Sequence, residues 1–184
     1  MASLTRKYRR FPDMKLIPIP YSFICEHVLL SWRDALWGYE RQLIGWSDIV
    51  AIAENRLVLG SDNPMEIELA CLGKTDTQQI GELLRVLANN EPDDAGDTSD
   101  KKWLFLVLAW LFENKDAVSN PLSEVEIIYA DFDYPPEIQA FVSYMPVTDG
   151  YDSSQHSIEE NKTRLFSKWE QYLSKTRQDI GIYK

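Results

Sequence analysis

Residues 31–60 read "SWRDALWGYERQLIGWSDIVAIAENRLVLG" and decide the fold class, because they carry two consecutive helical patterns. Ser31 followed by Asp34 resembles a capping box, in which each side chain satisfies a backbone N–H of the other residue. Leu36, Tyr39 and Leu43 continue one apolar face at helical spacing. The first half of the stretch therefore predicts an amphipathic helix that begins next to Ser31.

The second half predicts another helix, which begins at Gly45–Trp46 and stops at Gly60. Both halves share a Trp-x-Asp start, with the two copies fourteen residues apart, but one pair does not make a repeat architecture. Asp34 and Asp48 each lie in a first helical turn, where an acid satisfies exposed N–H groups and the helix dipole. Neither acid needs a chemical role.

Helical patterns cover nearly all of the remaining chain. They are bounded by prolines at the starts and by glycines or polar loops at the ends. In residues 120–132 a short strand is the alternative, although the longer pattern favours a helix. The expected helices outside 31–60 fall in 21–30, 61–73, 76–90, 102–115, 120–132, 136–142 and 157–177, with loops at 91–101 and 145–155. We expect an all-α, single-domain multi-helix bundle of about nine helices.

The domain boundaries follow from composition. Residues 1–13 are basic, and we expect either a disordered tail or an artefact of start-site choice, with Met14 as an alternative start. Residues 14–184 form the single expected domain, because helices on both sides of the 91–101 loop have the same character. No apolar stretch reaches transmembrane length.

The charge is strongly negative and unevenly distributed. The chain has 19 basic and 29 acidic residues, for a net charge of −10. This balance disfavours nucleic acid and anionic membranes and favours a basic partner. From Asp116 to Asn161 the chain contains ten acids and no Lys or Arg. A solvated face and a docking surface both account for such a span.

Catalytic and metal-binding motifs are absent from the sequence. The glycines form no phosphate-binding loop, and the two histidines and two cysteines are scattered, without the spacing of a zinc site. Cys25 and Cys71 lie in apolar runs, so we expect buried free thiols in a reducing cytoplasm. We expect His27 to be a hydrogen-bonded core or boundary residue. No cofactor is predicted.

Asp131 and Asp133 are the best candidates for chemistry. Two residues apart on a helix, they point in nearly opposite directions and cannot share a metal unless the helix has ended. If it ends at Asp131, Asp133 or Tyr134 can cap the next helix, which begins after Pro135. Capping is the preferred interpretation, and a metal-dependent hydrolase that uses the two carboxylates is the alternative.

Four segments, in order, resemble a known family: "FICEHVLLSWRDALWGYE", "IGWSDIVAIA", "WLFLVLAWLFEN" and "IIYADFDYPPEIQAFVSYMP". The similarity is to a bacterial domain-of-unknown-function family, encoded beside polymorphic and contact-dependent-inhibition toxins and regarded as immunity proteins. It covers about residues 14–174 and is most specific at 129–135 and 144–146. It implies a non-enzymatic cytoplasmic protein that binds and neutralises a cognate toxin, often a nuclease. It transfers no binding residue to this chain.

The acid-only span is the predicted contact surface, because an acidic protein can occupy the basic groove of a nuclease and associate quickly. Tyr134, Tyr144 and Tyr151 are candidate anchors, although Tyr134 and Tyr144 fit the core equally well. The predicted charges are Glu124, Glu126, Asp131, Asp133, Glu137, Asp149 and Asp152. A helical adaptor without any toxin partner is a further alternative.

Overall fold

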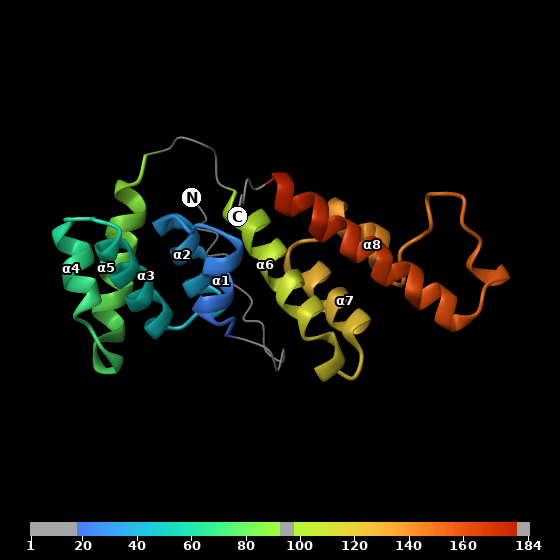
Figure 1. The fold of residues 1–184 in the computed structure, drawn as a ribbon, viewed down its shortest axis with the longest axis horizontal. Helices are drawn as coiled ribbons and strands as arrows, with labels where there is room; N and C mark the ends of the chain where they lie inside the picture. The colour runs from blue at the N-terminus through green and yellow to red at the C-terminus, as the bar shows by residue number, and fades with distance from the viewer. Residues whose placement is uncertain (1–17, 93–97, 180–184) are drawn as a thin grey trace, which may run out of the picture. The chain divides into compact units, whose positions relative to one another are not determined.

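The structure is a computed structural model that describes residues 18–92 and 98–179 (Figure 1). These residues form eight α-helices and four short 3₁₀ helices, labelled η, and they contain no strand. The prediction of an all-α fold is confirmed. The favoured helix in 120–132 is also confirmed, and the alternative of a short strand there is wrong. The predicted tail of residues 1–13 lies outside the described residues.

The chain divides into two compact units, Met1–Trp103 (unit 1) and Leu104–Lys184 (unit 2). The division falls inside one helix, α6 (Ser99–Glu113). The prediction of a single domain over 14–184 therefore stays a prediction.

Unit 1 is built from α1 (Tyr21–His27), α2 (Trp32–Glu40), α3 (Trp46–Val58), α4 (Pro64–Ala70), η1 (Lys74–Asp76), α5 (Thr77–Asn90) and the start of α6. Helix α3 packs on α4, and α2 packs on α5. The capping box is confirmed: the Asp34 backbone N–H donates to Ser31 Oγ at 3.0 Å, and the Ser31 N–H donates to Asp34 Oδ2 at 2.9 Å. Gly60 follows α3 with a φ of +98°, as its predicted stop role requires.

A network of charged side chains joins the helices of unit 1. The Glu91 carboxylate, just after α5, accepts the backbone N–H groups of Trp32 and Arg33 at 2.7 and 3.0 Å. The buried Glu66 carboxylate accepts Trp32 Nε1–H at 2.7 Å. Arg56 lies 3.5 Å from both carboxylates and donates to the Leu30 carbonyl at 3.0 Å. Side chains far apart in sequence thus hold the start of α2.

Unit 2 contains the rest of α6, η2 (Lys115–Ala117), α7 (Pro121–Asp131), η3 (Pro136–Phe141), η4 (Ser153–Gln155) and α8 (Ile158–Asp179). Helix α8 packs on η3 through Trp169, whose ring stacks on Phe141 with 6.0 Å between centroids. Phe112 meets the same indole edge-on at 5.1 Å. The predicted Asn120–Pro121 start is confirmed, because the Asn120 side chain accepts the Ser123 N–H.

Burial confirms some predictions and contradicts others. The apolar run of α6 is almost fully buried from Trp103 to Ala109. His27 is buried, with Nδ1 2.9 Å from the Phe23 carbonyl. Cys25 and Cys71 are free but exposed, so the prediction of buried thiols is wrong. The reason is that both lie in or beside seven-residue helices, which bury only one face.

Candidate functional site

All ten predicted contact residues lie in unit 2, on α7, η3 and the adjoining turns and loop. Six are exposed: Asp133, Tyr134, Glu137, Tyr144, Asp149 and Asp152. The other four, Glu124, Glu126, Asp131 and Tyr151, are partly buried. The span therefore presents a surface, although its members differ in how accessible they are.

Helix α7 ends in a Schellman motif. The Tyr134 N–H donates to the Tyr129 carbonyl at 2.8 Å, and the Asp133 N–H donates to the Ala130 carbonyl at 3.3 Å. Asp133 and Tyr134 consequently adopt φ values of +64° and +61°, which a bulky residue such as tyrosine rarely takes. The N-cap of η3 is Pro135. The prediction that Asp133 or Tyr134 caps that helix is therefore wrong, because both residues terminate α7 instead.

This ending of α7 brings three tyrosines together, and we call Tyr129, Tyr134 and Tyr144 the tyrosine patch. The buried Tyr129 ring meets Tyr134 edge-on, with 5.2 Å between centroids, and lies 6.3 Å from Tyr144. Tyr134 and Tyr144 are each 57% exposed, so their assignment to the core is wrong. A buried aromatic base thus supports two exposed rings.

The surroundings of the tyrosine patch are anionic. Ser143, which directly precedes Tyr144, donates its hydroxyl to the Glu126 carboxylate. Partial desolvation, followed by the influence of Tyr129, Tyr134 and Glu126, raises the pKa of the Tyr144 phenol above its ordinary value. The phenol therefore stays neutral at physiological pH, and the ring keeps the electron-rich faces of a tyrosine.

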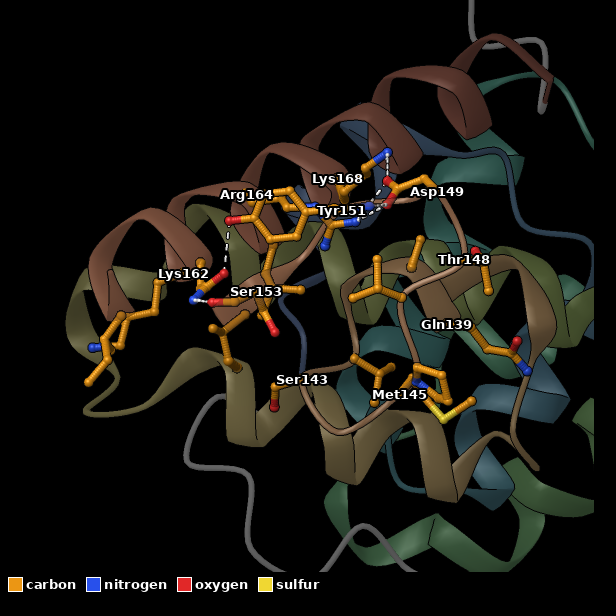
Figure 2. A pocket seen from close by; sticks show the side chains of 18 of the residues that line it. Gln139, Ser143, Met145, Thr148, Asp149, Tyr151, Ser153, Lys162, Arg164 and Lys168 are labelled. Carbon is orange, nitrogen blue, oxygen red and sulfur yellow. Dashed lines mark hydrogen bonds and ion pairs between the residues drawn. The ribbon is translucent and has the colours of Figure 1, made fainter. Parts of the chain in front are cut away.

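The contacts of Asp149 show that an acid of the acid-only span can have basic partners from elsewhere in the chain. Its carboxylate binds Arg164 Nη2 at 2.7 and 2.8 Å and Lys168 Nζ at 3.2 Å, both on α8 (Figure 2). The hydrogen bonds from Arg164 and then Lys168 lower the pKa of Asp149 to about 2. The acids of the span are therefore not all uncompensated, because basic residues beyond Asn161 pair with Asp149 and, through Lys162, with Glu159.

Tyr151 and Asp152 also have internal partners. The Tyr151 hydroxyl donates to Asn161 Oδ1 at 2.8 Å, and its ring contacts Arg164 at 4.4 Å and His156 at 4.5 Å. Asp152 accepts the Ser154 N–H at 3.0 Å and thereby caps η4. These contacts tie the loop to α8 and leave Tyr151 less available as an anchor than Tyr134 or Tyr144.

A cavity of about 650 Å³ lies between this loop, the start of α7, η3 and the first half of α8. Figure 2 shows Asp149 beside Arg164 and Lys168, with Tyr151 next to Arg164 and Lys162 farther along α8 toward its start. Sequence reasoning missed these three cations. The i, i+4 spacing of Arg164 and Lys168, which places them on one face of a helix, is the signal that could have identified them.

Asp131 and Asp133 do not form a paired site on one helix face, since α7 ends between them. Asp131 is partly buried in the last turn, whereas Asp133 is exposed beyond it. Within residues 18–92 and 98–179, no group of three or more His, Cys, Asp or Glu side chains is arranged to hold a metal ion. Over the same residues, no helix has the length and apolar character needed to cross a membrane.

The chain matches the sequence model of one known protein family. The model of a family described as "Uncharacterized protein conserved in bacteria (DUF2247)" matches residues 21–177. No curated protein and no solved structure matches the chain. The matched range includes every residue of the candidate surface.

Proposed function

We propose that this chain, which belongs to the bacterial DUF2247 family, is an immunity protein that binds and neutralises the toxin domain of a cognate effector. The observation that carries the proposal is the exposed tyrosine pair, which stands on a buried aromatic base inside a span without basic residues. The family resemblance described above supports the same conclusion. In this proposal the protein acts by binding in the cytoplasm and has no catalytic task, cofactor or metal.

The chemistry of the surface favours a basic partner such as a nuclease toxin. Aromatic anchors supply most of the binding energy in many interfaces, while surrounding charges set the association rate and partner choice. Nucleases present basic grooves to their substrates, and a carboxylate-rich face can occupy such a groove. Glu126, Asp133 and Glu137 lie around the tyrosines in space or sequence and are suited to this role.

Reversing two charges of this surface should weaken binding. We expect Glu126→Lys combined with Glu137→Lys to slow association about tenfold at low salt, because the electrostatic attraction to a basic partner is lost. The loss should shrink at high salt, where the attraction is already screened. Binding to the toxin domain encoded beside the gene, measured at both salt concentrations, checks this, together with protection of cells that co-express the toxin.

A matched control changes the same charge elsewhere. Glu54→Lys combined with Asp62→Lys reverses two exposed acids of unit 1, so each double variant moves the net charge from −10 to −6. The control should protect as well as the unmodified protein. Equal protection and equal affinity for both double variants would mean that the acid-only span is a solvated face. A wild-type protein that neither binds nor protects would overturn the immunity function itself.

A further inference from the structure

The exposed rings of the tyrosine patch differ from Trp32, Trp37 and Tyr151 in lacking a cation over the ring. Arg41 lies 3.6 Å from the Trp37 centroid, Arg56 4.5 Å from Trp32, and Arg164 4.4 Å from Tyr151. Within the described part of the chain, no Lys or Arg lies over Tyr134 or Tyr144. The faces of these two rings are therefore open to a cation from outside.

The charges around the tyrosine patch also favour the binding of a cationic group. The face of a tyrosine ring carries a negative quadrupole, which attracts cations. The Glu126 carboxylate accepts a hydrogen bond from the hydroxyl of Ser143, which directly precedes Tyr144. Because no Lys or Arg occurs between Asp116 and Asn161, no cation from within that part of the sequence competes for Glu126. The combination disfavours an anionic partner group.

The backbone holds this surface ready for binding. The Schellman hydrogen bonds keep Asp133 and Tyr134 in the left-handed region, and the buried Tyr129 ring supports both exposed rings from below. A non-glycine residue rarely adopts this conformation unless the surrounding structure holds it there. A ring that is already fixed in its bound orientation loses little conformational entropy when a partner docks.

We propose that the tyrosine patch, with Glu126, is a receptor for an arginine side chain of the protein partner. Arginine fits better than lysine because its planar guanidinium can stack on a tyrosine ring while its N–H groups donate to a carboxylate. The inference deepens the proposed function, and it rests on that function for the identity of the partner as the toxin. The receptor itself can be tested without the toxin.

The first test uses the full chain and two synthetic peptides of equal length, oligo-arginine and oligo-lysine. Charge attraction alone draws both peptides equally, whereas stacking favours arginine. We expect the wild-type protein to prefer oligo-arginine about fivefold in affinity. The double variant Tyr134→Ala with Tyr144→Ala should lose the preference, and Tyr134→Phe with Tyr144→Phe should keep it, because phenylalanine retains the ring face.

Two controls separate this effect from misfolding and from a general apolar contact. Val58→Ala removes an exposed apolar side chain of unit 1 and should leave the arginine preference unchanged. Helical circular dichroism and the melting temperature should agree for all variants, since the replaced rings are mostly exposed. No preference in the wild-type protein, or an unchanged preference in the double alanine variant, would refute the receptor.

The second test asks whether the toxin supplies the arginine. We expect Tyr134→Ala to weaken toxin binding about tenfold, and we expect the alanine variant of one toxin arginine to weaken it by a similar factor. When the two variants are combined, the loss of affinity should be no larger than for either variant alone. Strong binding that tolerates Tyr134→Ala and Tyr144→Ala would overturn the receptor and leave the immunity function intact. Coupling to a lysine instead, or a dimer of this chain that Tyr134→Ala dissolves, would replace the proposed occupant.

Discussion

Asp34→Ala is expected to lower the free energy of unfolding by about 3–5 kcal/mol, which is large enough to unfold a marginal domain. Asp34 is only 2% exposed, and its carboxylate binds Lys102 Nζ at 2.5 Å and Ser99 Oγ at 2.7 Å. It also completes the capping box with Ser31. The alanine variant leaves a partly buried ammonium and a buried hydroxyl without this partner, and this loss is the main cost. Urea denaturation followed by circular dichroism measures it.

The same carboxylate should make stability depend on acid pH. Burial raises the pKa of Asp34, but hydrogen bonds from Lys102, Ser31 and Ser99 outweigh burial and hold the pKa below its ordinary value of 3.8. A folded-state pKa that is depressed contributes stability above the unfolded-state pKa and loses it as the pH falls through the folded-state pKa. The difference between wild type and Asp34→Ala should therefore be full at pH 7 and should shrink below about pH 4.

Asp48→Ala is the matched control, because Asp48 occupies the corresponding position of α3. Its carboxylate accepts the Gly45 N–H at 2.7 Å, and it has no ion pair among the described residues. Because this variant loses only a capping interaction, we expect its free energy of unfolding to fall by about 1 kcal/mol. Equal destabilisation by the two variants would show that the contacts with Ser99 and Lys102 contribute nothing to stability.

Gly38→Ala is the second substitution with a large expected effect, and it should destabilise by about 3 kcal/mol. Gly38 lies inside α2, where alanine would normally gain about 1 kcal/mol over glycine. A Cβ at this position, however, would overlap the indole ring of Trp103. Trp103 is 0% exposed, and its Nε1–H donates to the Asp34 carbonyl at 2.7 Å, so the ring cannot move aside cheaply. Thermal and urea unfolding both report the change.

Gly81→Ala provides the comparison within another helix, α5. A Cβ there would lie 3.6 Å from Arg85 Nη1 and 3.9 Å from Tyr39 Cε1, which are ordinary contact distances. We expect this variant to be stabilised by up to about 1 kcal/mol. If Gly38→Ala were instead as stable as Gly81→Ala, the close packing of α2 against Trp103 would have to relax at little cost.

Local chemistry predicted much of the helical framework. The Ser31–Asp34 box, the prolines at the starts of α4 and α7 and the stop at Gly60 all act within a few residues, so their effects are visible in sequence. Amphipathic spacing identified the buried stripe of α5 in the same way. Spacing alone does not determine burial at a helix end: Ile158 continues the apolar face of α8 but is 74% exposed as its first residue.

The candidate surface depended on contacts that no local pattern encodes. Sequence placed Tyr134, Tyr144 and Tyr151 in one class, whereas the structure exposes the first two and ties the hydroxyl of Tyr151 to Asn161. The sequence of the acid-only span contains no basic residue, but in the structure Arg164 and Lys168 of α8 form ion pairs with Asp149. The contacts of Tyr151 and Asp149 arise because α8, later in the chain, folds back onto their loop.

Asp34 and Asp48 show the same division most clearly. Each follows a tryptophan by two residues, and the sequence by itself determined that each carboxylate accepts a backbone N–H at a helix start. Only the tertiary structure decided that Asp34 is also buried against Ser99 and Lys102. Those partners are more than sixty residues away in the chain. Capping depends on four neighbouring residues, whereas the burial of a charge depends on which distant helix covers it.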